Sequence, residues 1–122
     1  MNKMTMAGLA IGLALLTAPA AKAQDAAAGE SMFKRACLAC HTVEAGKNKV
    51  GPSLHGVVGR KAGEVGNFNY SPAMKDSGKT WDEATLKEYL KDPKASIPGN
   101  KMAYAGLKNE KQLNDVVAYL AS

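Results

Sequence analysis

The stretch CLACHTVE, Cys37–Glu44, decides the fold of this chain. It holds both cysteines of the 122-residue sequence and one of its two histidines. Two residues separate the thiols, so they lie about one turn apart if this stretch is helical, and His41 follows the second thiol directly. The fold must therefore bring two thiols and an imidazole to one place.

Three kinds of site use such a cluster. A disulfide between C-x-x-C thiols is usually redox-active, but a thioredoxin-like enzyme needs alternating strands and helices, and the sequence has no strand pattern. A zinc site needs four ligands, and no second Cys/Cys or His/His pair accompanies His41 and His55. Covalent haem attachment uses both thiols and takes the next histidine as an iron ligand. The pattern and its context favour haem attachment over the other two.

The first 23 residues have the pattern of a secretory signal peptide. Lys3 precedes an apolar run over residues 4–16, and Ala21, Lys22 and Ala23 fit an A-x-A cleavage site. The alternative is a membrane anchor, but this run is short for a bilayer core, which needs about 20 residues. We expect cleavage after Ala23, which leaves one exported domain, residues 24–122.

The mature domain is mildly basic. The full chain has 16 basic and 11 acidic residues, and removing Lys3 and Lys22 leaves 14 against 11, so the net charge falls from +5 to +3. The lysines are spread out and form no basic arm, so nucleic acid is not an expected partner. A diffuse lysine surface suits transient docking with acidic proteins, or it serves solubility alone.

Helix signals stand at both ends of the domain. Asp25 can cap a helix over residues 26–40, with Ala28, Met32 and Phe33 on one face. Asn109 can cap a C-terminal helix. Its apolar residues recur at helical spacing: Leu113, Val116, Val117 and Leu120.

A third helix and a long loop lie between these ends. Thr80 and Glu83 form a capping-box pattern for the helix, and Pro93 stops it. Its apolar residues are Leu86, Tyr89 and Leu90. Residues 46–72 contain six glycines and two prolines, and so long a loop is unusual in a compact domain. A large apolar group that the loop surrounds would explain it, so the sequence calls for a cofactor.

A second iron ligand would come from the methionines of the mature chain. Met32 is too near Cys37 to reach the opposite haem face, and Met74 follows Pro72 in a polar stretch. Met102 lies in the segment IPGNKMAYAGL, where a Pro-Gly pair can turn the loop inward. A Met/His pair is one mode of haem ligation. Core filling is the other interpretation of Met102.

The mature chain resembles the class I c-type cytochromes, especially the bacterial periplasmic relatives of mitochondrial cytochrome c. The likeness extends from about Ala27 to Leu120. Its matching segments are CLACHTV, GPSLHGVVGRKAG, FNYSPA, TWDEATLKEYLKDPKASIPGNKMAYAGL and VVAYLAS. The resemblance implies an all-α cytochrome c fold, with three main helices plus short helical turns wrapped around one covalently bound haem.

The resemblance also implies roles for individual residues. Cys37 and Cys40 would carry the thioether bonds, and His41 and Met102 would be the axial ligands. The carbonyl of Pro52 would accept a hydrogen bond from His41 Nδ1–H and fix the ring's orientation.

The remaining implied roles concern the surroundings of the haem. Tyr89 would direct its hydroxyl toward the Met102 sulfur. The haem propionates would be bonded or shielded by Arg60, Tyr70 and Trp81. Where the terminal helices cross, Gly29 and Phe33 would pack against Tyr119.

Three positions depart from the family pattern without removing an iron ligand. Asn100 stands where many relatives have a threonine near the inner propionate, and Met74 replaces a common asparagine. Tyr104 stands where phenylalanine is usual. His55 matches a family position that is not a ligand, and we expect it to be a surface or hydrogen-bonded histidine.

The resemblance implies a soluble, monomeric one-electron carrier and not an enzyme. Its donor would be a membrane cytochrome bc complex, and its acceptor an oxidase, a photosynthetic reaction centre or a reductase. Five lysines would steer acidic partner faces to the exposed haem edge: Lys34, Lys49, Lys94, Lys101 and Lys108. The alternative function is a haem peroxidase or gas-binding sensor, which requires a labile Met102.

Overall fold

A computed structural model of the chain describes Gly12 and residues 24–122. The predicted signal peptide, residues 1–23, therefore lies outside the described residues except for Gly12. The described part contains five helices and no sheet, which agrees with the expected all-α class. Three are long, α1 (Ala26–Ala36), α3 (Glu83–Lys91) and α5 (Glu110–Ala121), and two are single turns, α2 (Pro72–Lys75) and α4 (Pro93–Ser96).

Helix α1 begins as predicted but ends earlier. The side chain of Asp25 caps it by accepting the Ala28 N–H at 3.1 Å. The helix stops at Ala36, so the prediction that it continues to Cys40 is wrong. The last turn tightens, as helix ends commonly do. The N–H groups of Cys40 and His41 both donate to the Cys37 carbonyl, at 3.1 and 2.9 Å, so the three residues stay within one turn.

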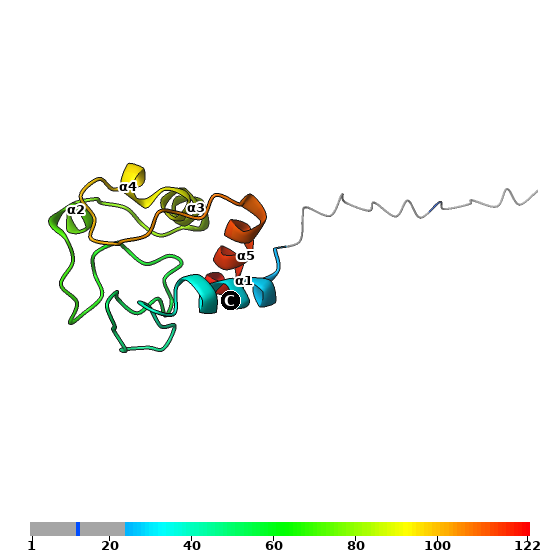
Figure 1. The fold of residues 1–122 in the computed structure, drawn as a ribbon, viewed down its shortest axis with the longest axis horizontal. Helices are drawn as coiled ribbons and strands as arrows, with labels where there is room; N and C mark the ends of the chain where they lie inside the picture. The colour runs from blue at the N-terminus through cyan, green and yellow to red at the C-terminus, as the bar shows by residue number, and fades with distance from the viewer. Residues whose placement is uncertain (1–11, 13–23) are drawn as a thin grey trace, which may run out of the picture.

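Helices α1 and α5 cross in close contact (Figure 1). The crossing lies at Gly29, where a side chain would collide with the backbone carbonyl of Asp115. Beside it, the rings of Phe33 and Tyr119 pack with their centroids 5.5 Å apart. The expected crossing is therefore present, and it depends on the absence of a Cβ at Gly29.

The N-terminal cap was predicted correctly for α5 and wrongly for α3. Asn109 caps α5 by accepting the Gln112 N–H at 3.0 Å, as predicted. Asp82, and not Thr80, caps α3, because its carboxylate accepts the Thr85 N–H at 2.7 Å. Thr80 instead pairs with Lys61 in an isolated β-bridge, so its backbone is committed to another segment.

The helices surround one buried core. The predicted apolar faces supply most of it: Phe33, Leu86 and Tyr89 from the first two long helices, with Leu113, Val116, Val117 and Leu120 from α5. Except for Pro72, the predicted long loop is part of a longer segment without helix in the structure, residues 41–71, which ends where α2 begins. This segment, called the long loop from here on, lies on one side of the core, with α2, α3 and α4 above it and α1 and α5 to the right in Figure 1. In the part of the chain described here, no helix is long and apolar enough to span a membrane.

Candidate functional site

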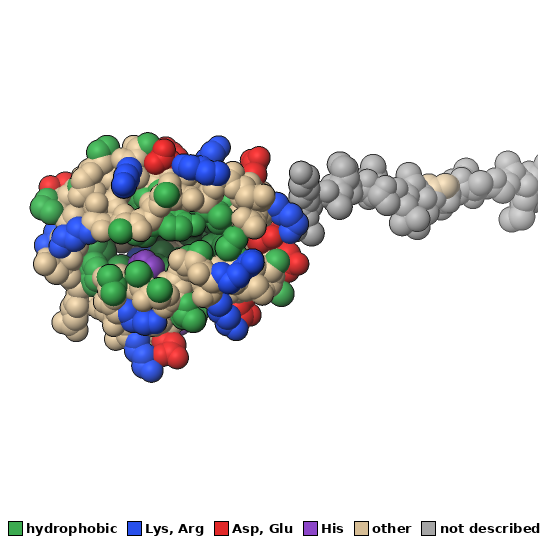
Figure 2. Space-filling view, in the orientation of Figure 1, with side chains coloured by type: hydrophobic (Ala, Val, Ile, Leu, Met, Phe, Trp, Pro, Cys, Tyr) green, Lys and Arg blue, Asp and Glu red, His purple; other side chains and the backbone are tan. Residues whose placement is uncertain are grey.

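A cavity of about 570 Å³ lies between the long loop and the helices. Its lining is mostly apolar and includes core side chains such as Phe33, Leu86 and Val116. It opens at the surface as a hollow in which hydrophobic side chains and a histidine are visible (Figure 2). Every site residue predicted from the sequence lines it: Cys37, Cys40, His41, Pro52, Arg60, Tyr70, Trp81, Tyr89 and Met102.

The two thiols lie at the wall of the cavity and are not joined in a disulfide. Cys37 is partly buried and Cys40 is exposed. Burial, with a smaller contribution from Cys40, raises the pKa of the Cys37 thiol. Within residues 24–122, no group of three or more His, Cys, Asp or Glu side chains is placed to hold a metal ion, as a zinc site would require.

The imidazole of His41 is fixed by its backbone neighbours. Its Nδ1 lies 2.8 Å from the carbonyl oxygen of Pro52, so Nδ1 carries the proton that it donates, and Nε2 keeps its lone pair. Burial and nearby Lys49 lower the pKa of His41, although the Pro52 bond opposes them, so the ring favours its neutral form. Gly51 makes room for the ring, since a Cβ there would lie 2.7 Å from Nδ1.

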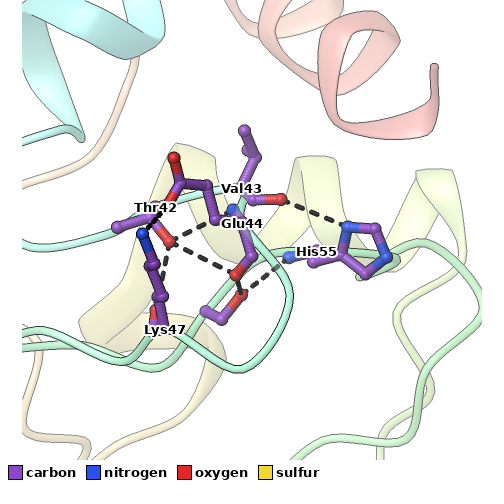
Figure 3. A network of polar contacts seen from close by, with 6 residues as sticks. Thr42, Val43, Glu44, Lys47 and His55 are labelled. Atoms are coloured by element: carbon purple, nitrogen blue, oxygen red, sulfur yellow. Dashed lines mark hydrogen bonds and ion pairs between the residues drawn. The ribbon is translucent and has the colours of Figure 1, made fainter.

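A network of polar contacts shapes the loop that carries Pro52 (Figure 3). Thr42 Oγ1 donates to the Lys47 carbonyl at 3.0 Å, and the Lys47 ammonium pairs with Glu44 at 2.8 Å. Buried Ser53 donates its hydroxyl proton to the Glu44 carbonyl at 2.6 Å and accepts the His55 N–H at 3.2 Å. These bonds fix the residues on both sides of Pro52, and therefore the carbonyl that orients His41.

His55 belongs to this network and not to the cavity wall. Its side chain is exposed, and its Nδ1 lies 3.2 Å from the Val43 carbonyl oxygen (Figure 3). This position agrees with the expectation of a hydrogen-bonded surface histidine.

Met102 approaches the cavity from the loop between α4 and α5. The hydroxyl of Tyr89 lies 4.0 Å from its sulfur, a weak contact in the direction that the family resemblance implies. Tyr89 is buried beside Trp81, with ring centroids 4.9 Å apart, and burial raises the pKa of Tyr89 to about 12. The hydroxyl therefore remains protonated and able to donate at any physiological pH.

The three residues expected near the propionates lie at the same wall. The guanidinium of Arg60 donates to the carbonyls of Ser53 and His55, at 3.0 Å each. The backbone N–H of Trp81 donates to the Arg60 carbonyl at 2.8 Å, which places the two residues side by side. The Tyr70 hydroxyl accepts the Val65 N–H at 3.2 Å, a bond that does not use its own proton. That proton and the Arg60 charge can meet an anionic group in the cavity.

The five predicted docking lysines differ in position. Only Lys101 lines the cavity, and its ammonium donates to the Asn69 carbonyl at 3.2 Å. Lys49 donates to the Leu38 carbonyl at 2.6 Å, next to the cysteines. The other three are exposed on or beside α1, α4 and the loop before α5: Lys34, Lys94 and Lys108.

Sequence reasoning missed several residues that shape the site. Gly51 precedes Pro52 directly, and its role as a cradle for the imidazole follows from no periodicity. Asn48 accepts the Ser53 N–H at 2.9 Å and donates to the Gly66 carbonyl at 3.1 Å, which joins two loop segments. Asn100, whose side chain accepts the Met102 N–H, was also missed as a residue that shapes the site. A sequence signal did exist for this bond, because asparagine favours an Asx-turn to the N–H two residues later.

This arrangement fits a haem group. The cavity offers two thiols, a neutral imidazole with a free Nε2, a thioether sulfur and a largely apolar wall. Histidine and methionine are one pair of axial ligands that proteins use for haem iron. Gly51 leaves the imidazole unobstructed, and the polar groups at the wall are matched to carboxylates.

Comparisons with known proteins agree with this chemistry. Residues 26–122 match the family model described as cytochrome c. The chain is 54% identical to cytochrome c2 of Blastochloris viridis over 109 residues, 88% of this chain and 84% of that protein. It is 57% identical to cytochrome c-550 of Bradyrhizobium diazoefficiens over 97 residues, 79% of this chain and 71% of the other.

A solved structure adds the same result for the fold. Cytochrome cH from Methylobacterium extorquens superposes with a TM-score of 0.74 at 52% sequence identity, covering 79% of this chain and 96% of that one. The fold, the thiol pair with its histidine and these likenesses agree: this chain belongs to the cytochrome c family, and it is an electron carrier with covalently bound haem c, not an enzyme.

Proposed function

We propose that the chain is a periplasmic one-electron carrier in which Cys37 and Cys40 form the thioether bonds and His41 and Met102 ligate the iron. The observation that carries this proposal is the single cavity that all four side chains line. When bound, the haem supplies an iron that gains and loses one electron. The protein's own residues hold the group, orient its ligands and exclude water.

The residues around His41 and Met102 would favour the reduced form of the haem iron. The apolar wall makes an added positive charge costly, which disfavours the oxidised form. Tyr89 donates toward the Met102 sulfur and lowers its electron density. Both effects raise the reduction potential relative to an exposed site.

The polar groups at the wall fit the propionates. Arg60 supplies a positive charge in a partly buried position, because a guanidinium stays protonated in proteins even where, as here, burial lowers its pKa. Burial also raises the pKa of Tyr70, so its hydroxyl remains a donor. Trp81 is buried and adjoins Arg60, and we expect its ring to shield the propionates from water.

The partners are redox proteins, and we place them in a membrane electron-transfer chain. A cytochrome bc complex would reduce the protein, and an oxidase, photosynthetic reaction centre or reductase would oxidise it. Residues 1–23 would direct the chain to the periplasm and be cleaved after Ala23, which leaves residues 24–122 as the mature domain. Transient contacts of this kind gain speed from charge steering.

Replacement of Met102 tests the ligand assignment. Met102→Ala should retain covalent haem, lose the weak Met–iron charge-transfer absorbance of the ferric protein and lower the reduction potential. Met74→Ala is the matched control, because Met74 lines the same cavity and is not assigned to the iron. An unchanged absorbance in Met102→Ala, or its loss in Met74→Ala alone, would overturn the assignment.

Charge reversal tests the docking lysines. Lys94→Glu removes an exposed member of the predicted set, and Lys75→Glu changes the net charge equally at an exposed lysine outside it. Electron transfer to a membrane fraction containing the partner should slow more for Lys94→Glu. The difference should shrink between about 10 and 150 mM salt, where the Debye length falls from about 30 to 8 Å. Equal rates for both variants at low salt would refute a specific role for Lys94.

A further inference from the structure

The loop that carries Met102 is attached to α4 through one side chain, Asn100. Its Nδ2 donates to the carbonyl of Pro93 at 2.9 Å and to that of Ile97 at 2.8 Å. Its Oδ1 accepts the backbone N–H of Met102 at 2.9 Å. The side-chain amide thus joins the first residue of α4, the residue that caps it and the backbone of the methionine.

The neighbouring residues make this amide the central attachment. Gly99 has a φ of +88°, so the chain turns sharply just before Asn100. Beyond the amide, the described contacts near Met102 are the backbone bond from the Asn100 N–H to the Ile97 carbonyl at 3.2 Å, the 4.0 Å contact from Tyr89 and a bond from exposed Lys101 to the Asn69 carbonyl. Among these described contacts, the amide is the one that binds both α4 and the Met102 backbone. The carbonyls of Pro93 and Ile97 also accept the backbone N–H groups of Ile97 and Asn100, at 3.0 and 3.2 Å, so the amide adds its bonds to a turn that the backbone already closes.

We propose that Asn100 is a positioning residue that holds the Met102 sulfur in the cavity by fastening its loop to α4. This inference rests on the proposed ligation by Met102. Asn100 also lines the cavity, but both protons of its amide are already donated to carbonyls, so they are not free for a propionate. Its role therefore differs from that of a threonine near the propionate, whose hydroxyl carries a single proton.

Displacement of Met102 from the iron must move its backbone and break the bond to Asn100. A hydrogen bond of this kind contributes about fivefold to an equilibrium constant. In Asn100→Ala, an added ligand that replaces Met102, such as imidazole, should therefore bind the ferric protein about fivefold more tightly or better. Asn100→Asp keeps an acceptor for the Met102 N–H but loses both donors to α4, which frees the loop from that helix, so it should also bind imidazole more tightly than the wild type.

The experiment titrates imidazole into the ferric haem protein and follows the Met–iron charge-transfer absorbance. Covalent attachment keeps the haem in each variant, and a urea unfolding curve shows whether the variant is folded. Asn109→Ala is the matched control, because it removes a capping asparagine from α5 while leaving the Met102 loop intact. Its imidazole affinity should equal that of the wild type.

The outcomes separate this inference from the function on which it rests. If the wild type lacks the Met–iron charge-transfer absorbance, or if Met102→Ala retains it, the ligand assignment fails. If the wild type behaves as assigned but both Asn100 variants bind imidazole like the wild type, the positioning role fails. Wild-type behaviour of Asn100→Asp alone would show that the turn to Met102 suffices and that the attachment to α4 is unnecessary, which also overturns the proposal.

Discussion

Substitution of Gly29 by alanine should open the crossing of α1 and α5. A Cβ at this position would collide with the Asp115 carbonyl oxygen and lie 2.5 Å from its carbonyl carbon and 3.0 Å from Tyr119 Cβ. The obstacle is backbone of the facing helix, so no side-chain rotation relieves it. The two helices must instead move apart, which loosens the packing of Phe33 on Tyr119.

The size of the effect follows from two opposed contributions. Overpacking of a close contact costs about 1–3 kcal/mol, and the rigid obstacle places this site at the upper end. Alanine gains about 1 kcal/mol over glycine within a helix. The net loss is then about 2 kcal/mol, which lowers the melting temperature of a domain this size by about 10 °C.

Guanidinium and thermal unfolding of the haem-containing protein measure this loss. Gly66→Ala is the matched control, because a Cβ at Gly66 meets nothing within 4 Å and its φ is not in the left-handed region. That change should be neutral or stabilise the protein by up to about 1 kcal/mol. If Gly29→Ala were as stable as Gly66→Ala, the close approach of the helices would not be what constrains Gly29.

Two further predictions concern single polar groups. Tyr89→Phe removes the donor to Met102 and should lower the reduction potential by about 20–40 mV, since a weak hydrogen bond contributes about 0.5–1 kcal/mol. Equilibrium redox titration measures this shift, and an unchanged or raised potential would contradict the role of the hydroxyl. Lys111, and then the Asp25 N–H, lower the pKa of Asp115. Stability from this carboxylate is present above its unfolded pKa of about 4 and is lost as the pH falls through the lowered folded value. Asp115→Asn should flatten the acid limb of unfolding curves, and an equally steep limb would exclude Asp115 as its source.

The helices were predictable wherever local periodicity agreed with packing. The spacing of Leu113, Val116, Val117 and Leu120 places all four in the core, and Asn109 caps their helix. Thr80 failed as a cap because its backbone pairs with Lys61, a partner distant in sequence. The prediction that α1 continues to Cys40 failed because alanine and leucine around the cysteines favour a helix. In the structure the chain instead tightens there into a turn that leads to His41.

The site divides in the same way between local pattern and tertiary contact. The thiols and His41 follow from a five-residue motif, and family resemblance led to Met102, Pro52 and Tyr89. The residues that hold the loops in place were not predictable, because their partners are backbone carbonyls far along the chain. Asn48, for example, donates to the carbonyl of Gly66, 18 residues along the chain. No periodic pattern encodes such bonds, since side chain and acceptor are brought together only by the fold.

The same bonds explain how so loop-rich a chain keeps a defined cavity. Strands would have satisfied the backbone groups of residues 41–71 with one another, but the described part of the chain contains only one isolated bridge. Asn48 and Ser53 supply partners there through their side chains, and Asn100 does the same in the loop that carries Met102. A loop held this way can be shaped around a group that is not protein, because each bond fixes one point and leaves the inner face apolar. The haem then completes the core from within, and the residues that orient its ligands are also those that hold the loops together.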